Sequence, residues 1–227
     1  MKNTLLTVLI IDDHPLISEA YKRAFEVISS ESSDISFSIS VANNCEAADA
    51  KIKEIATNNK KLDIVFLDIK LPPSQDGRIL SGEDIGIKIN KLLPETKVIV
   101  STTFNDNYRI HSIFRNLNPD GFLIKNDITP IELVTTIKNI ISDPPYYSKT
   151  VVKLLRKEVS NEFLLDNIDR KLLYELSIGA KMKDLPKILP LSIAGIEKRK
   201  RHLKQIFNVK SVDDKELLLK AREMGFI

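Results

Sequence analysis

The segment DIVFLDIKLPP, residues 63–73, decides the fold of the first half of the chain. Residues 64–67 are apolar and rich in branched or aromatic side chains, which is typical of a buried strand. Asp68 stands at the end of this strand, and Pro72 and Pro73 end the run. Burying a lone carboxylate costs several kcal/mol, so the position of Asp68 needs a chemical reason.

Strand-like and helical segments alternate on both sides of this stretch. Helical periodicity fills the gaps between the strands, and Thr129 is well placed to cap a helix that begins at Pro130. The alternation predicts an α/β domain, a doubly wound five-stranded parallel sheet with helices on both faces. The predicted strands cover residues 7–11, 37–41, 64–67, 97–101 and 121–124.

Polar side chains follow the predicted strands at the point where each strand ends. Right-handed crossovers put the carboxyl ends of parallel strands at one edge of the sheet, where ligands bind. Three carboxylates at this edge would repel one another and imply a bound cation, and oxygen ligands suit Mg²⁺. A carboxylate nucleophile beside Mg²⁺, with an ammonium and a hydroxyl nearby, is typical of phosphoryl transfer. The residues concerned are Asp12, Asp13, Asp68, Ser101, Thr102, Thr103 and Lys125.

Each of these residues also has a simpler interpretation. The two aspartates after the first strand could cap a helix, and Lys125 could be an ordinary solvated lysine, but their joint placement at successive strand ends favours a site. His14 is not expected to be a metal ligand or part of a triad, because it opens a helix just before Pro15 and no second histidine has ligand spacing. A haloacid-dehalogenase-type phosphatase would need an acid two residues after Asp68, where Lys70 stands.

Four motifs, in this order, resemble the receiver domain of two-component response regulators. They are IIDDHPLI at 10–17, VFLDIKLP at 65–72, VIVSTTF at 98–104 and GFLIK at 121–125. The resemblance covers residues 5–143 and implies a flavodoxin-like fold. It implies that a sensor histidine kinase phosphorylates Asp68, and that the protein is no enzyme apart from Mg²⁺-dependent self-phosphorylation and self-dephosphorylation.

The resemblance also implies a role for each matching residue. Phosphorylation adds about two negative charges, toward which Thr102 would move. Phe122, at the place of the family's switch aromatic, would follow and change the surface around the fourth helix and fifth strand. The implied roles are Mg²⁺ binding by Asp13 and Asp68 directly, by Asp12 through water and by the backbone carbonyl of Lys70, and phosphoryl binding by Thr102 and Lys125.

Residues 73–83, PSQDGRILSGE, form a longer and more polar loop than is typical of receivers at this place. The loop adjoins Asp68, and it could gate phosphatase access, shape kinase choice or change the lifetime of the phosphoryl group. A tolerated surface insertion is the slightly favoured interpretation.

Composition bounds the class of protein. The chain has 227 residues, 43% of them hydrophobic, which is enough for one large or two small domains. No apolar run approaches the roughly 20 residues of a membrane span, and the N-terminus lacks a signal peptide's cleavage pattern. With the single cysteine Cys45, neither an internal disulfide nor a four-cysteine zinc site is expected, and a cytoplasmic location is the simplest.

Charge divides the chain into an acidic front and a basic back. Residues 1–143 hold 16 Lys and Arg against 20 Asp and Glu, a net charge of −4, and the remainder holds 18 against 11, a net charge of +7. The segment SDPPYYSKT at 142–150 ends the alternating pattern and is interpreted as a linker, because two prolines stop the preceding helix. The predicted domains are a receiver at 1–143, a linker and linker helix at 144–165, and a helical domain at 166–227.

The basic part predicts a helix-turn-helix arrangement. Asp184 can cap a short helix with Pro186 in its first turn, and Ser192 can cap a strongly basic helix at 193–207. The second helix of such a pair can lie in the major groove of DNA. Residues 166–227 resemble the LuxR-type DNA-binding domain. By that resemblance Glu197, Lys198 and Arg201 would read bases, and Arg199 and Lys204 would hold phosphates.

The sequence therefore predicts a cytoplasmic response regulator that controls transcription. Once phosphorylated, it would act as a homodimer on double-stranded DNA with two half-sites. One alternative is a receiver whose output domain binds an acidic protein partner and not DNA, which is favoured by Pro186, Gly195 and Glu197 because they depart from the LuxR-type pattern. Another is a phosphate sink in a relay, which would not need the basic domain.

Overall fold

The computed structural model describes residues 4–32, 34–105, 107–156, 165–211 and 213–227. The chain forms two compact units, one made mainly by the residues up to Arg156 and the other mainly by the residues after it. Each unit has a hydrophobic core of its own. Within the described ranges, no helix has both the length and the apolar sequence needed to cross a membrane.

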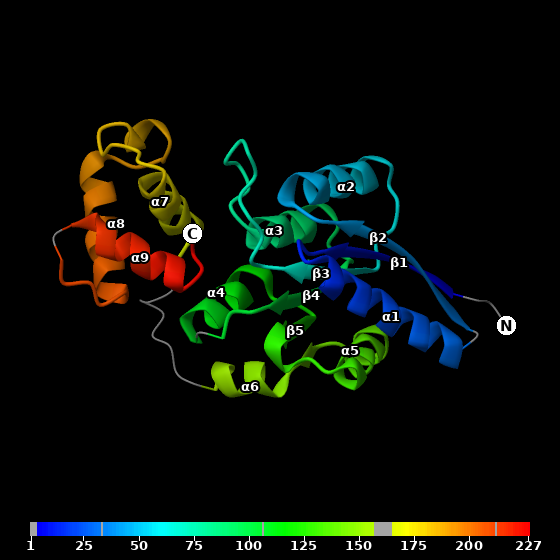
Figure 1. Cartoon of the computed structure of the whole chain (residues 1–227). Coiled ribbons are helices and arrows are strands. Elements are labelled where there is room, and N and C mark those ends of the chain that lie inside the picture. The colour runs from blue at the N-terminus through cyan, green and yellow to red at the C-terminus, as the bar shows by residue number, and fades with distance from the viewer. Residues whose placement is uncertain (1–3, 33, 106, 157–164, 212) are drawn as a thin grey trace. The chain divides into compact units, whose positions relative to one another are not determined.

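A sheet of six parallel strands forms the centre of the first unit (Figure 1). Its strand order is β2-β1-β3-β4-β5-β6, so the direction of winding changes between β1 and β3. Such a switch point leaves a crevice at the carboxyl ends of the two strands. The strands are β1 Thr4–Ile11, β2 Ile35–Ala42, β3 Ile64–Asp68, β4 Lys97–Thr102, β5 Gly121–Ile124 and β6 Tyr146–Tyr147.

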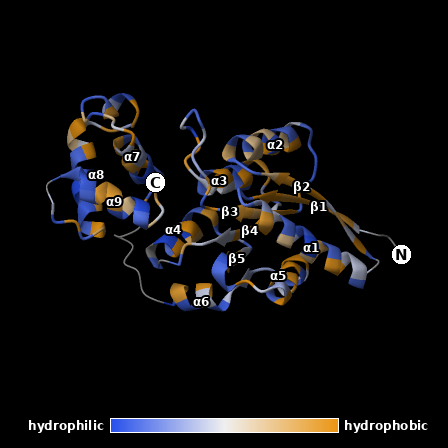
Figure 2. Ribbon diagram, in the orientation of Figure 1, coloured by the Kyte–Doolittle hydropathy of each residue, from blue (hydrophilic) through white to orange (hydrophobic). Residues whose placement is uncertain are grey.

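Helices cover both faces of this sheet, which confirms the predicted doubly wound fold. Helices α1 and α5 pack together over Val8, Ile10 and Phe66, and on the other face the Leu67 side chain approaches Gly86 of α3. Figure 2 shows hydrophobic residues along β1 and β2 and on α1 and α5. The helices that precede Arg156 in the chain are α1 Pro15–Glu31, α2 Cys45–Thr57, α3 Gly82–Leu92, α4 Asn107–Leu117, α5 Pro130–Ser142 and α6 Lys149–Leu155.

The sixth strand corrects the prediction of a five-stranded sheet. Strand β6 pairs in parallel with β5, and its Tyr146 backbone N–H donates to the carbonyl oxygen of Asp120 at 2.9 Å. The backbone N–H of Ser148 then donates to the carbonyl oxygen of Phe122 at 2.9 Å, and the Ser148 side chain caps α6. The predicted linker segment therefore begins inside the sheet. Two residues are too few to show strand periodicity in a sequence.

The long loop after β3 has an internal structure. The Ser74 hydroxyl accepts the backbone N–H of Ile79 at 3.0 Å and donates to Asp76 at 2.6 Å. The backbone N–H of Gln75 donates to Glu46 of α2 at 2.7 Å. The extra residues thus form a turn that is tied to α2.

The second unit is helical and packs around a leucine-rich core. Gly179, with φ of +89°, follows the first helix of this unit, and Ser192 caps α8 by accepting the N–H of Gly195 at 3.2 Å. Because of Pro186, the first helix of the predicted pair is only the 3-10 turn η3. The elements are α7 Asn167–Ser177, η3 Leu185–Lys187, α8 Ile193–Ile206 and α9 Asp214–Glu223, and the core includes Leu172, Leu185, Ile196, Leu203 and Leu217.

Gly82 and Gly195 each lie in the first turn of a helix but differ in the space around them. A Cβ atom on Gly82 would lie 1.8 Å from the carbonyl oxygen of Asp68, whereas one on Gly195 would have Ser192 Oγ, at 3.5 Å, as its nearest neighbour. We expect Gly82→Ala to lower the free energy of unfolding by about 2–3 kcal/mol, because backbone must move. We expect Gly195→Ala to raise it by up to about 1 kcal/mol through helix propensity. Urea unfolding of both variants beside the wild type measures the difference, and equal effects would contradict this description of Gly82.

Candidate functional site

Asp68 ends β3 at the edge of the sheet where β1, β4 and β5 also end. It pairs in register with Ser101 of β4, and Thr102 pairs with Ile124, directly before Lys125. Asp68 is 2% exposed. The parallel strands therefore bring together the polar residues that the sequence predicted at this edge.

The ammonium group of Lys125 lies between two buried carboxylates. Its Nζ atom is 2.6 Å from Asp68 Oδ2 and 2.7 Å from Asp12 Oδ2. The three side chains are 6%, 2% and 1% exposed, respectively. Asp68 is thus not buried alone, because a cation offsets part of the cost of taking it out of water. Asp13 lies in the same group as Asp12 and Asp68, so three carboxylates gather at this edge of the sheet.

Backbone N–H groups hold the other oxygens of the same carboxylates. The N–H of Lys70 donates to Asp68 Oδ1 at 2.8 Å, and the N–H of His14 donates to Asp12 Oδ1 at 2.9 Å. Burial raises the pKa of Asp68 above its ordinary value, while Lys125 and the Lys70 N–H oppose this shift. A carboxylate with a raised pKa is a better nucleophile once it is ionised, which suits the role predicted for Asp68.

Tyr21 supports this edge from α1, and the sequence analysis did not identify it. Its hydroxyl donates to Ser101 Oγ at 2.6 Å. Burial raises the pKa of Tyr21 well above its ordinary value, and the charges of Asp12 and Asp68 add to that effect. Tyr21 is therefore a neutral hydrogen-bond donor. In the sequence it belongs to an apolar helical stripe, which indicates packing and not a polar contact.

The acidic residues have the donor atoms that a divalent cation needs. One ligand atom from each of Asp12, Asp13, His14 and Asp68 lies within 4.8 Å of the others. Asp13 Oδ1 is shielded from solvent and has no hydrogen-bond partner among the described residues. Three carboxylates fit Mg²⁺, which prefers oxygen ligands.

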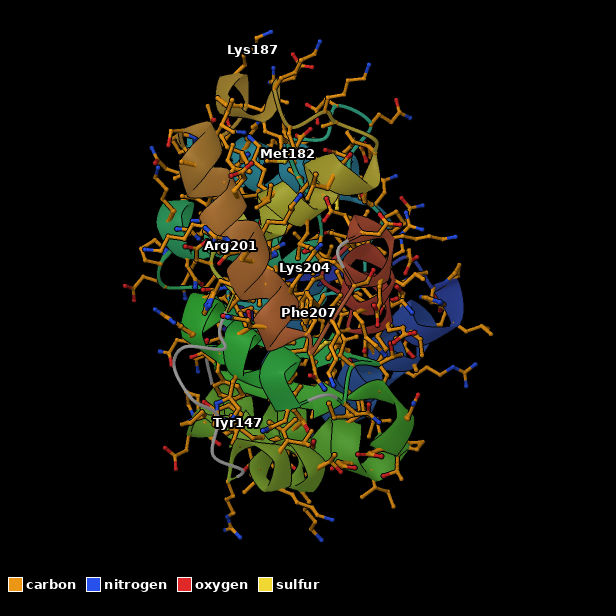
Figure 3. The ribbon with its side chains drawn as sticks, turned by 90° about the vertical axis from the view of Figure 1, so that its left-hand side faces the viewer. Tyr147, Met182, Lys187, Arg201, Lys204 and Phe207 are labelled. Atoms are coloured by element: carbon orange, nitrogen blue, oxygen red, sulfur yellow. The ribbon has the colours of Figure 1, made fainter. Side chains whose placement is uncertain are left out.

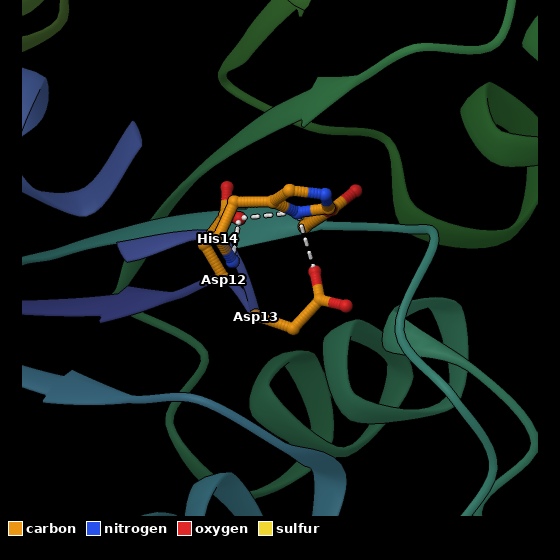
Figure 4. Close-up of side chains that lie close together, drawn as sticks. Asp12, Asp13 and His14 are labelled. Atoms are coloured by element: carbon orange, nitrogen blue, oxygen red, sulfur yellow. Dashed lines mark hydrogen bonds and ion pairs between the residues drawn. The ribbon is translucent and has the colours of Figure 1, made fainter. Parts of the chain in front are cut away.

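His14 lies against these acids, beside which it stands in the sequence. Its Nδ1 atom is 2.7 Å from Asp13 Oδ1 (Figure 4). The residue occupies the N-cap position of α1 with an extended backbone, and its side chain caps nothing. The imidazole is therefore available to the neighbouring carboxylates. The adjacency of DDH in the sequence was the signal for this contact.

Thr102 and Phe122 lie deep in the first unit. The Thr102 hydroxyl accepts the backbone N–H of Phe104 at 3.2 Å. The Phe122 ring is fully buried and stacks on Phe114 of α4 with 5.2 Å between ring centroids. Phe114 in turn meets Tyr147 of β6 edge-on at 4.9 Å. The predicted switch aromatic therefore has two aromatic neighbours, one on α4 directly and one on β6 through Phe114.

The charged residues of α8 divide into two groups. Glu197, Lys198 and Arg201 are exposed, as base-reading residues must be. Arg199 instead donates to both Asp166 and Asp169, each at 2.8 Å, and so holds the start of α7. Lys200 and Lys204 of the same helix both pair with Asp214, at 2.8 and 2.9 Å. Figure 3 labels Arg201 and Lys204 on this helix.

The pairs of Arg199 and Lys204 lie within the second unit, although the sequence predicts phosphate contacts for both residues. Their partners on α7 and α9 are distant in sequence, so charge pattern along α8 alone could not find them. Lys200, which is half-buried, likewise donates to Asp214 within the second unit.

Lys125→Ala tests the buried ion-pair arrangement. We expect it to lower the free energy of unfolding by about 3 kcal/mol, because two buried carboxylates lose their cation. Lys138 is a matched control, since it pairs with Glu31 at 2.5 Å with both side chains 52% exposed. Lys138→Ala should change stability by less than about 0.5 kcal/mol. Urea unfolding measures both, and a Lys125 effect as small as that of Lys138 would show that the bridge does not stabilise the fold.

Comparison with known proteins agrees with this geometry. Residues 8–138 match the response regulator receiver domain family. The oxygen regulatory protein NreC of Staphylococcus epidermidis is 22% identical over 97% of this chain and 100% of its own length. NreC of Staphylococcus aureus is 25% identical with the same coverage.

Solved structures show a similar fold over nearly the whole chain. A structure of two RcsB dimers bound to two parallel DNAs has a TM-score of 0.58 at 20% identity, covering 97% of this chain and 99% of that one. RcsB from Salmonella enterica serovar Typhimurium, bound to promoter P1flhDC with the phosphomimetic BeF3−, has a TM-score of 0.58 at 19% identity, covering 95% and 97%. Since the family match spans more than half of the chain and contains every residue of the acidic edge, the chain belongs to the response regulator receiver domain family.

Proposed function

We propose that this protein is a response regulator whose Asp68 accepts a phosphoryl group from a sensor histidine kinase, and that it controls transcription by binding DNA. The observation that carries the first half is the bridge from Lys125 to Asp12 and Asp68, with Asp13 beside it. This is a buried nucleophile among groups that can take up anionic charge.

The chemistry assigned to the site is a single displacement at phosphorus. An oxygen of ionised Asp68 forms a bond to phosphorus, the P–N bond to the kinase histidine breaks, and the imidazole nitrogen keeps the electron pair. Lys125 would pair with the phosphoryl oxygens, and the Thr102 hydroxyl would donate to one of them. Mg²⁺, held by Asp12, Asp13, Asp68 and the Lys70 carbonyl, would neutralise charge between the carboxylates and the phosphoryl group.

Exposure on α8 supports the DNA-binding half of the proposal. Lys198 and Arg201 point away from the core of the second unit, where the buried side chains of α8 are Ile196 and Leu203. Solved structures of similar fold are described as RcsB dimers bound to DNA. We propose the same arrangement here, a dimer that reads two half-sites through paired α8 helices.

A protein-binding output is the second candidate. It is favoured by the exposed carboxylate of Glu197 and by the internal pairing of Arg199 and Lys204, which leaves less charge for phosphates. Under this alternative the protein still takes phosphate on Asp68, but no DNA sequence is enriched from a random pool.

Asp68→Asn should abolish incorporation of phosphate from a small-molecule phosphodonor in the presence of Mg²⁺, because the nucleophile is lost. Intact-mass spectrometry of the full-length protein measures this directly. Asp143→Asn, at an exposed aspartate, is the control and should be modified like the wild type. Phosphate on the Asp68→Asn protein would place the acceptor elsewhere.

Lys198→Ala and Arg201→Ala should each weaken binding to the preferred DNA sequence by about 1–3 kcal/mol and relax its selection. Titration against enriched duplexes, at fixed salt and with phosphodonor, measures the loss. Lys215→Ala, at an exposed position of α9, is the control for the removal of one positive charge. Equal losses on all sequences for Lys198 and Arg201 would refute their base-reading role.

Arg199→Ala should instead lower the stability of the second unit, because it leaves Asp166 and Asp169 without their cation.

A further inference from the structure

His14 brings a nitrogen atom to a site otherwise made of carboxylates. Its side chain is 63% exposed, so one side of the ring meets solvent while Nδ1 faces the acids. Nδ1 lies 2.7 Å from Asp13 Oδ1 and 3.4 Å from Asp12 Oδ1 (Figure 4). Neither the fold nor the proposed phosphoryl transfer needs an imidazole at this place.

The contact with Asp13 does not have the alignment of a hydrogen bond. Asp13 Oδ1 has no hydrogen-bond partner among the described residues, although His14 Nδ1 is so close. Two ligands of one first-row metal ion, each bound at about 2.1 Å, lie roughly 3 Å apart in an octahedral site. The two distances from Nδ1 to the carboxylates fall on either side of that separation. Nδ1 is therefore spaced from each carboxylate oxygen as one ligand of a cation is from the next.

We propose that His14 is a metal ligand that lets the acidic site bind nitrogen-preferring ions of the first transition row, such as Ni²⁺, Co²⁺ and Zn²⁺, in addition to Mg²⁺. Imidazole is a good ligand for these ions, whereas Mg²⁺ takes oxygen ligands. The inference rests on the proposed function in one respect, that Asp12, Asp13 and Asp68 hold Mg²⁺. A transition ion on His14 would compete with Mg²⁺ and so with phosphorylation of Asp68.

A purely supporting role for His14 makes a different prediction. If the imidazole only orients Asp13, its loss lowers the affinity for every ion that Asp13 binds. If the imidazole is a ligand, its loss lowers the affinity only for ions that bind nitrogen ligands. Comparison of two classes of ion on one variant therefore separates the two roles.

The experiment is calorimetric titration of full-length, tag-free protein with NiCl₂ and, separately, MgCl₂, in slightly alkaline buffer without phosphodonor. We expect His14→Asn to lower Ni²⁺ affinity by about 10- to 100-fold and to change Mg²⁺ affinity less than twofold. His202→Asn removes an exposed imidazole from α8 and is the matched control, with both affinities unchanged. The visible absorption of bound Co²⁺ should also shift in the His14 variant, because a nitrogen ligand has been replaced.

Two outcomes would overturn the proposal. Equal loss of Ni²⁺ and Mg²⁺ affinity in His14→Asn would assign His14 to orientation of Asp13, and unchanged Ni²⁺ affinity would remove it from the site. Failure of the proposed function is seen separately, as wild-type protein that binds Mg²⁺ but takes no phosphate on Asp68 from a donor. The metal titrations contain no phosphodonor, so their result does not depend on whether Asp68 is phosphorylated.

Discussion

One ammonium group between two buried carboxylates is the constraint on which the first unit depends. Lys125 can reach both Asp12 and Asp68 only because β1, β3 and β5 are parallel and end at one level. Slipping any of these strands by one residue would turn its side chains to the opposite face and leave a charge buried without a partner. The site thus helps to specify the register of the sheet that carries it.

The same arrangement explains why the site is poised for a further cation. Burial and the neighbouring charge of Asp12 raise the pKa of Asp68, against the opposing effect of Lys125. Asp13 Oδ1 also lacks a hydrogen-bond partner among the described residues, although His14 Nδ1 lies 2.7 Å away. Functional sites commonly keep charged residues that do not stabilise the fold, and the buried carboxylates at this edge of the sheet are an example.

Residues read in order along the chain predicted most of the first unit, because its signals are local. Strand ends, the cap at Thr129 and the polar residues of the carboxyl edge were all visible as short patterns. Contacts between distant residues were not: Tyr21 with Ser101, and Arg199 with the start of α7. The net positive charge of the second unit also overstated the number of side chains available to DNA, because Arg199 and Lys204 form ion pairs within the unit. Strand β6 escaped prediction because its two tyrosines owe their conformation to β5 and not to their own periodicity.

Strand β6 also changes how the end of the first unit is tethered. The carbonyl group of Phe122 is bonded to the N–H of Ser148, and Ser148 is the residue whose hydroxyl starts α6. The Phe122 ring stacks on Phe114, and Phe114 contacts Tyr147, the residue before Ser148. Phe122 is therefore linked to residues 147–148 in two ways, by the hydrogen bond of its backbone carbonyl and by the contacts of its ring through Phe114. A displacement of the Phe122 backbone would stretch the bond to Ser148 or carry the first turn of α6 with it, whereas a rotation of the Phe122 ring would disturb its stacking on Phe114 and, through Phe114, the contact with Tyr147.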